Sequence, residues 1–501
     1  MLTHRYRLVF LIGLVIASLQ SCVVSKKSWS PSTPYAKEQL QKDYRLFRNI
    51  LEESHPSLYW YTAKDSMDYY FDWGYRQLND SMTEPQFRSI LSYVIAKIKC
   101  GHTSTRYSRK FLHFLDTAQL PQFPISIKVL DRDTVVLNNY IQRSNLKLAR
   151  GTILTSLNGA PIKRIVDSLV LHIPQDGNNE NYLMQTISNR GAFGGWLRLV
   201  AGYVPAYQLG YLDSLGREQQ TVFNLVDPPK KDSSRKPILP EIRRQLKRRE
   251  QRANELDRAR SLQIDTGLST GYMTVNTFNN GYQLKSFFRS AFKDLRRFNI
   301  QHLVIDIRSN GGGNVAHSTL LTKKIRNTPF KLADSLYAVK RKSRYGNYIR
   351  YNSVTGIFMR FISKKKADGF YHFGYFERKQ FKPALRDRYK GKVYVLTGPN
   401  SFSAAAIFAL TVKGQSNVTL IGEETGGAAY GNSAWFIPDV RLPETGIRFR
   451  LPKFRLVINK NAVKDGRGVL PDIEVKATRQ SVIENRDLKV ETVRQLIIQK
   501  R

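Results

Sequence analysis

The chain has 501 residues and is strongly basic, with 80 lysine and arginine residues against 40 aspartate and glutamate residues. This length exceeds what one hydrophobic core usually serves and predicts two or three domains, and a hydrophobic content of 41% excludes a disordered chain. The net charge of +40 raises nucleic acid as a partner, but no zinc-finger, RRM or homeodomain pattern accompanies it, so we expect no specific nucleic-acid binding.

The N-terminus is typical of a secretory signal. Arg5 and Arg7 precede an apolar run over residues 8–19, which is too short to cross a membrane. The run ends at Leu19-Gln20-Ser21-Cys22, which resembles a bacterial lipoprotein cleavage box. We therefore expect removal of residues 1–21, lipidation of Cys22, and a location in the bacterial cell envelope, at the outer membrane facing the periplasm. The alternative is an ordinary signal peptide followed by an incidental cysteine.

Residues 22–118 are predicted to form a helical domain. Apolar residues recur at helical spacing over residues 40–51 and again over residues 87–98. The second run ends at Gly101, a helix stop that predicts an exposed turn at His102.

Residues 119–226 are predicted to form a β-rich domain. The stretch over residues 149–162 resembles the core of a PDZ-like module, in which a strand is capped by a tight turn at Asn158-Gly159. PDZ modules bind extended peptides by adding a strand to a sheet edge, although the Gly-Leu-Gly-Phe loop that binds a terminal carboxylate is absent here. A purely structural β domain is the alternative.

Residues 227–262 are predicted to be a basic linker, because a proline-containing loop leads into a polar helix over residues 243–260 with little apolar face. A membrane or nucleic-acid contact through this segment is the alternative.

Residues 263–480 are predicted to form an α/β domain with a parallel sheet. Strand patterns at residues 271–275 and 302–307 flank a helix pattern at residues 284–298, and such alternation implies parallel strands. Residues 481–501 are expected to form a C-terminal helix or tail.

Two predicted strands of this domain end in turns whose residues are typical of catalytic sites. The strand at residues 302–307 leads into Gly311-Gly312-Gly313, whose N–H groups no Cβ shields, so that they can donate to a developing oxyanion. The strand at residues 393–397 leads to Ser403 at the start of a small-residue helix, whose dipole favours negative charge there. A serine beside oxyanion donors indicates acyl transfer. The glycine run lacks the spacing and lysine of a nucleotide-binding loop.

Four ordered blocks resemble the S41-type serine peptidases of the C-terminal processing and tricorn core type. They are the glycine signature at residues 306–313, the nucleophile turn at residues 401–404, and the blocks at residues 422–427 and 465–472. The resemblance implies a multidomain α/β protein with a crotonase- or ClpP-like catalytic domain that hydrolyses polypeptides without a cofactor. The residues themselves show no metal-binding pattern, since the chain has only two cysteines and no His-Glu-x-x-His.

The resemblance also implies roles for individual residues. Ser403 matches the nucleophile, with Ser401 as its competitor, and the oxyanion hole would use the N–H of Gly312 or Gly313 together with that of Ala404. The turn Gly101-His102-Thr103 resembles the place where tricorn-type members carry a catalytic histidine.

Four positions depart from the family pattern or compete with it. Ala428 stands where processing peptidases carry their lysine base, which moves the base role to His102. Asp465 stands, as a shorter acid, where the family carries its supporting acid, and Gly101 replaces the second serine of the tricorn relay, for which Thr103 or Ser104 is the alternative. His317 is a second histidine close to the glycine run.

The sequence therefore predicts a lipid-anchored serine endopeptidase that hydrolyses extended or unfolded polypeptides through an acyl-enzyme. The alternative is a catalytically inactive envelope lipoprotein that binds peptides. A third reading is a binder of nucleic acid or envelope polymer through the basic residues 243–260.

Overall fold

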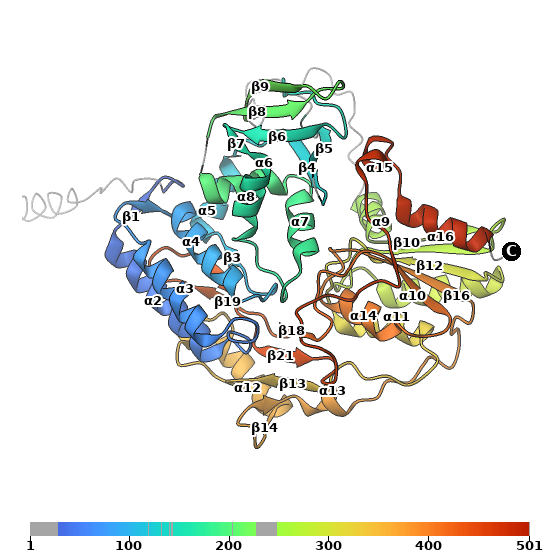
Figure 1. Ribbon diagram of the computed structural model, residues 1–501. Coiled ribbons are helices and arrows are strands. Elements are labelled where there is room, and N and C mark those ends of the chain that lie inside the picture. Colours follow the sequence, from blue (N-terminus) through green and yellow to red (C-terminus); the bar gives the residue numbers. More distant parts are fainter. Residues whose placement is uncertain are drawn as a thin grey trace, which may run out of the picture.

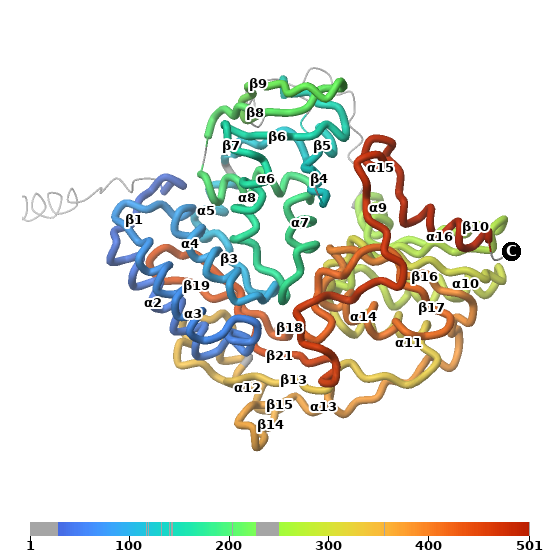
Figure 2. Tube along the Cα trace, viewed as in Figure 1, coloured from blue at the N-terminus to red at the C-terminus, as the bar shows by residue number. Residues whose placement is uncertain are grey.

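The computed structural model describes residues 29–499, apart from positions 119, 132, 140, 142, 143 and 203 and the segment 227–247. Three regions surround a central junction (Figures 1 and 2): N-terminal helices, a β-rich region beside them, and an α/β region built from the second half of the chain. The predicted signal sequence, Cys22 and the first part of the predicted linker lie outside the described residues.

The N-terminal helices each bury one face. Leu40, Phe47 and Leu51 of the first helix are fully buried, and Phe87, Leu91 and Ile95 occupy the same core. Helix α4 begins with a capping box at Thr83 and a proline in its first turn. The elements of this region are β1 (Pro34–Tyr35), α2 (Lys37–Ser54), α3 (Lys64–Arg76), β2 (Met82–Thr83), α4 (Glu84–Lys97), β3 (Thr105–Arg106) and α5 (Arg109–Thr117).

A segment from the far end of the chain completes the core of these helices. Strands β19 (Asp439–Arg441) and β20 (Arg448–Arg450) form a small sheet with β3, in which Phe449 lies opposite Thr105. Asp43 of α2 is fully buried and accepts hydrogen bonds from the N–H groups of Glu444 (3.0 Å) and Thr445 (2.8 Å). The helical region is therefore not closed within residues 22–118.

The β-rich region is an antiparallel sheet with the strand order β4-β5-β6-β8-β9. The predicted Asn-Gly turn is present, because Asn158 and Gly159 both have positive φ (50° and 76°) between β6 and β7. The elements are β4 (Ile125–Val129), β5 (Thr134–Asn139), β6 (Ile153–Leu157), β7 (Ala160–Pro161), α6 (Ile162–Val170), α7 (Glu180–Ser188), α8 (Ala192–Ala201), β8 (Ala206–Leu212) and β9 (Glu218–Asn224).

The loop between α6 and α7 reaches the junction of the three regions (Figure 1). The N–H of Gly177 donates to Lys99 O at the end of the helical region (3.0 Å), and the N–H of Asn178 donates to Gly466 O of the α/β region (2.9 Å). This loop therefore joins all three regions at one place.

The α/β region is built on a six-stranded sheet with the order β10-β11-β12-β16-β17-β22. Its strands are parallel except for β10 at the edge. One face packs on α10 and α14, and the other packs on α16. The elements are β10 (Arg260–Asp265), β11 (Thr270–Val275), α10 (Leu284–Arg297), β12 (His302–Asp306), α11 (Val315–Ile325), β16 (Lys392–Thr397), α14 (Ala404–Val412), β17 (Val418–Gly422), β22 (Ile473–Glu474), α15 (Arg479–Ile483) and α16 (Leu488–Ile498).

The predicted strands and helix of this region are present, and the predicted parallel sheet is confirmed. The second part of the predicted linker is ordered as helix α9 (Arg248–Ala259), which is followed directly by β10. Strand β10 begins at Arg260, so the six-stranded sheet includes residues that the sequence assigned to the linker.

A second sheet, with the order β14-β15-β13-β21-β18, lies beside the first. Strands β14 and β15 come from the basic, tyrosine-rich residues 340–390, whereas β18 and β21 come from the chain after α14. The elements are β13 (Ser335–Ala338), the 3-10 helix η1 (Gly346–Tyr348), α12 (Asn352–Ile362), β14 (Lys364–Lys365), β15 (Tyr371–His372), α13 (Gly374–Arg378), β18 (Gly431–Ala434) and β21 (Phe454–Val457).

Candidate active site

Ser403 lies where the chain turns from β16 into α14. Its φ and ψ are 54° and −120°, a combination that L-residues rarely adopt. Such a strained turn between a strand and a helix exposes a nucleophile at the end of a sheet. Ser403 is half-buried, while Ala404 and Ala405 behind it are buried in the core.

Ser401, the competing nucleophile, is occupied by structural hydrogen bonds. Its hydroxyl is fully buried, donates to Ile307 O (2.8 Å) and accepts from the N–H of Gly398 (3.2 Å). These contacts join the ends of β12 and β16, which are neighbouring parallel strands. Ser403 is therefore the available serine of this turn.

The glycine loop after β12 lies against Ser403 and is fixed by Asn310. The fully buried Asn310 side chain donates to Val275 O (2.9 Å) and accepts from the N–H of Gly312 (2.9 Å), and its carbonyl accepts from the N–H of Phe402 (3.0 Å). A Cβ on Gly312 would lie 2.7 Å from Ser403 Cβ, so only glycine fits at this contact.

Two backbone donors remain available beside Ser403. Within the described residues, no hydrogen bond is made by the N–H of Gly313 or by that of Ala404, and both residues line the same pocket as Ser403. The N–H of Gly312 is already bound to Asn310. Of the two predicted glycine donors, Gly313 is therefore the one that can serve an oxyanion.

His102 follows α4 and is buried, so the predicted exposed turn is wrong. The side chain is 7% exposed because its ring packs against Phe402, with 4.9 Å between centroids. Neither ring nitrogen makes a hydrogen bond among the described residues. His102 and Ser403 line the same two pockets, so the structure brings the predicted base and nucleophile to one site.

The carboxylate nearest to His102 belongs to Asp176, in the loop between α6 and α7. Asp176 is 2% exposed, and its Oδ1 lies 3.8 Å from His102 Nδ1 and accepts a hydrogen bond from the N–H of Gly101 (2.8 Å). Its Oδ2 is buried without a partner in the described structure. Sequence reasoning missed Asp176, because nothing in its local pattern separates it from an ordinary turn aspartate.

Asp465, the predicted acid, lies in an exposed turn. Its Oδ1 accepts from the N–H of Arg467 (2.8 Å), and its carbonyl accepts from the side chain of Asn178 (3.3 Å). The structure thus places Asp465 beside the loop that carries Asp176, but it is Asp176 that lies against His102.

A second histidine supports the turn that carries His102. His55 is 4% exposed, accepts from the N–H of Ser57 at Nδ1 (3.1 Å) and contacts Thr103 Oγ1 at Nε2 (2.8 Å). The first bond fixes the neutral tautomer with the proton on Nε2, which donates to Thr103. Burial, aided by the positive charges of Arg455 and Lys453, lowers the pKa of His55 to about 3.

Two adjoining cavities of about 620 and 310 Å³ both have Ser403 in their lining. The larger is lined by Tyr182 and Arg450, among other residues, and burial lowers the pKa of Arg450 while it raises that of Tyr182 to about 12. The smaller is lined by Trp435 and Phe436. No lysine of the described part of the chain lines either cavity, and Ala428 is buried at the position expected for one.

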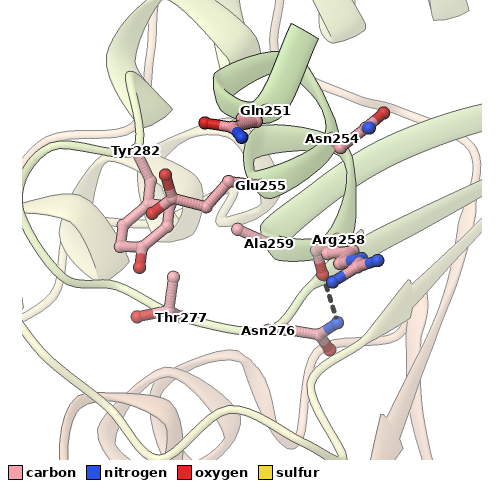
Figure 3. A pocket seen from close by; sticks show the side chains of 8 residues that line it. All are labelled: Gln251, Asn254, Glu255, Arg258, Ala259, Asn276, Thr277 and Tyr282. Atoms are coloured by element: carbon pink, nitrogen blue, oxygen red, sulfur yellow. Dashed lines mark hydrogen bonds between the residues drawn. The ribbon is translucent and has the colours of Figure 1, made fainter. Parts of the chain in front are cut away.

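Three further features, His317, a hollow beside α9 and Cys100, contribute no residue to the lining of these cavities. His317 donates from Nδ1 to Phe278 O (2.9 Å) and does not line the cavities. The hollow between α9 and the loop at residues 276–282 (Figure 3) shares no residue with them. Burial raises the pKa of Cys100 to about 11, as expected for an inert thiol.

Residues 269–475 match the family model described as Peptidase family S41. This region is an S41 peptidase domain. The family predicted from the four sequence blocks is thereby confirmed, and the S41 domain contains Ser403, the glycine loop and Ala404 but neither His102 nor Asp176.

Solved structures extend the likeness to the whole fold. Mature CPAF has a TM-score of 0.61 and 16% identity, with 92% of this chain and 98% of that chain covered. Mature CPAF complexed with lactacystin has the same TM-score and coverage at 14% identity. The TM-scores show a shared fold, and the identities are too low to show more than the fold. Because 92% of this chain is covered, the shared fold includes regions that precede the S41 domain. No curated protein sequence matches the chain.

No helix in the described ranges is long and apolar enough to cross a bilayer. Within the same ranges, no group of three or more His, Cys, Asp or Glu side chains is arranged to hold a metal ion.

Proposed function

We propose that this protein is a serine endopeptidase that forms an acyl-enzyme at Ser403 and uses His102 as its general base. The observation that carries the proposal is the strained turn at Ser403, which sets the hydroxyl beside the free N–H groups of Gly313 and Ala404. Donors fixed in advance around a developing oxyanion supply the largest part of catalysis in acyl transfer.

The proposed proton transfers follow from the two faces of the imidazole. Nδ1 of His102 faces Asp176, so Nε2 is the nitrogen that takes the proton from Ser403 as its oxygen attacks the peptide carbonyl. The same nitrogen then gives the proton to the leaving amine. In the second half, Nε2 accepts a proton from water as the water oxygen attacks the acyl-enzyme. Nε2 then gives this proton to Ser403 Oγ as the acyl–oxygen bond breaks and the product acid is released.

In this proposal Asp176 is the acid that orients His102. The distance of 3.8 Å between Oδ1 and Nδ1 is longer than a hydrogen bond, and catalytic contacts often shorten only when substrate binds. The second carboxylate oxygen of Asp176 has no partner in the described structure and is therefore free to accept the Nδ1 proton.

Cleavage within a chain is supported by the two cavities that Ser403 lines, because together they leave room for several substrate residues around the scissile bond. Extended or unfolded polypeptide is the proposed substrate, because a peptide bond must be drawn between the buried His102 and the glycine loop.

Hydrolysis of an unstructured protein such as casein by the chain from Val23 onward tests the proposal. We expect Ser403→Ala and His102→Ala to lose at least about a thousandfold in turnover. Ser290→Ala, on the exposed face of α10, is the matched control and should keep full activity. Labelling of Ser403 by a fluorophosphonate, read by mass spectrometry, would locate the nucleophile directly.

Unchanged hydrolysis by the Ser403→Ala variant would overturn the proposal. Failure of the folded wild-type chain to cleave any of several unstructured substrates would instead favour the inactive peptide-binding protein.

We further propose that the protein is held in the cell envelope by lipid on Cys22, at the outer membrane facing the periplasm. The support is the sequence Leu19-Gln20-Ser21-Cys22 after an apolar run. Metabolic labelling with an alkyne-bearing fatty acid should modify the wild-type chain and not Cys22→Ser, and equal labelling of both would refute the anchor.

A further inference from the structure

Helix α12 presents a row of large apolar side chains to solvent. Val354, Ile357, Phe358 and Phe361 are 68%, 59%, 45% and 85% exposed, and Tyr351 just before the helix is 63% exposed. Their spacing of three and four residues places them on one helix face. The opposite face is anchored by Met359, which is fully buried in a core with β13 and β21.

Phe358 contacts Phe436, but every side chain of this row remains at least 45% exposed, which is unusual for a helix fixed to a packed core. Isolated apolar residues are common on protein surfaces, but a continuous row of aromatic and branched side chains marks a contact surface.

The charged residues of the chain around α12 are all positive. Residues 340–367 contain nine lysine and arginine residues and no aspartate or glutamate. Some of these cations are bound within the protein, such as Lys366 to Glu377 (2.7 Å). Arg360, Lys364 and Lys365, however, are exposed and form no ion pair with a described residue.

The charge distinguishes among possible partners for the apolar face. A second copy of this chain would bring two sets of unpaired cations together at the contact, which is electrostatically unfavourable. A bilayer with anionic headgroups instead accepts apolar side chains at its acyl boundary and neutralises the flanking cations.

We propose that α12 is an interfacial helix that docks this protein on an anionic lipid surface through Val354, Ile357, Phe358 and Phe361. Arg360, Lys364 and Lys365 bind the headgroups. This inference depends neither on the proposed peptidase activity nor on lipidation of Cys22.

The docking helix is attached to one wall of the candidate active site. The ring of Phe358 packs edge-on against Phe436, with 5.2 Å between centroids, and Phe436 lines the smaller cavity together with Ser403. Docking through α12 would therefore hold this cavity close to the lipid surface.

Flotation with vesicles tests the inference, using the chain from Val23 onward, which lacks Cys22 and keeps every described residue. We expect binding to vesicles of phosphatidylglycerol and phosphatidylethanolamine in about equal amounts, and at least tenfold weaker binding to pure phosphatidylcholine. Ile357→Ser/Phe361→Ser should weaken binding to the anionic vesicles by about tenfold or more.

Two matched controls separate this site from general surface properties. Lys364→Glu/Lys365→Glu should also weaken binding by about tenfold or more. Lys285→Glu/Arg289→Glu, on the exposed side of α10, changes the net charge equally and should have a clearly smaller effect. Leu215→Ser removes a 71% exposed apolar side chain elsewhere and should leave binding unchanged.

The inference is overturned if the wild-type chain does not bind anionic vesicles, or if the α12 variants bind as well as the wild-type chain. It is also overturned if wild-type chains form dimers in solution that Ile357→Ser/Phe361→Ser dissociates without altering vesicle binding. Loss of cleavage of a soluble substrate in that variant, with vesicle binding intact, would assign the face to substrate instead.

Discussion

The two halves of the candidate site are positioned in different ways. Ser403 and the glycine loop leave the ends of β16 and β12, which are adjacent parallel strands of one sheet. His102 and Asp176 come from two other regions of the chain and meet only where the α6–α7 loop contacts the end of α4. The nucleophile half is thus built by one sheet, and the base half depends on packing among three regions.

The two halves should therefore be sensitive to different perturbations. The carboxyl ends of neighbouring parallel strands lie at the same edge of a sheet. Substitutions in the nucleophile half should therefore act through local steric clashes. The base half rests on buried polar groups, among them His55 and Asp43, whose partners lie far away in sequence. Conditions that loosen domain packing should affect that half first.

The largest expected effect is on the nucleophile half. Gly312→Ala would place a Cβ 2.7 Å from both Ser403 Cβ and Phe402 O, on a residue with a φ of 96°. We expect peptide hydrolysis to fall by roughly a thousandfold or more, because the glycine loop and the oxyanion donors must move.

Gly311→Ala is the matched control, since a Cβ there meets no atom within 4 Å. It should retain activity within about tenfold of the wild type, measured as kcat/KM on one peptide. Similar losses in the two variants would show that the loop is not fitted to Ser403 as described.

The next largest effect is expected at the acid that orients His102, and two substitutions distinguish Asp176 from Asp465. Asp176→Asn should lower kcat by roughly a hundred- to ten-thousandfold, because an amide does not stabilise the imidazolium that forms during catalysis. Asp465→Asn should have a much smaller effect, because Asp465 is exposed and bound to Arg467. A larger loss in Asp465→Asn than in Asp176→Asn would identify Asp465 as the acid that supports His102, as the sequence predicts, and would exclude Asp176.

The same contrast explains what the sequence was able to predict. Ser403, the glycine loop and the parallel sheet follow from short local patterns, because strand, turn and helix signals are read over about ten residues. Asp176 carries no local signal, since its role arises from contact with a residue 74 positions earlier in the chain.

Burial of His102 was predicted wrongly for a related reason. A turn after a helix is usually exposed, but here the ring of Phe402 packs on His102 and is itself stacked on Tyr182, and these two rings come from two other regions of the chain. The closure of the helical region by β19 and β20 is likewise a long-range event that periodicity does not report.

A pH effect on stability is expected for the base half. Because burial lowers the pKa of His55 to about 3, the unfolded chain, with its histidine pKa near 6.5, binds more protons between these values. The contribution of neutral His55 is therefore complete above about pH 6.5, and the free energy of unfolding should fall as the pH drops towards 3.

Urea unfolding at several pH values between about 7.5 and 4.5 measures this slope. His55→Asn should cost roughly 1–3 kcal/mol at neutral pH and flatten the slope, because no group remains to be charged. His113→Asn, at a histidine with an 84% exposed side chain, should leave the slope unchanged. An unaltered slope in His55→Asn would assign the acid sensitivity to other groups.

The smallest effect concerns Gly101, where the sequence departs from the tricorn-type pattern. A Cβ on Gly101 would lie 2.6 Å from Phe402 Cζ, so the ring that packs on His102 occupies the space of any side chain at this position. Gly101→Ala should therefore displace Phe402 and lower kcat/KM by about tenfold, with little change in the free energy of unfolding.

Phe402→Leu removes the ring end that causes this contact and provides a direct test of the explanation. If the two positions are coupled through space, the double variant should lose less activity than the two single variants together. Additive losses would mean that Gly101 acts through its N–H bond to Asp176 rather than by making room for Phe402. In that case the glycine would belong to the support of the acid, and the base half would depend on backbone position more than on ring packing.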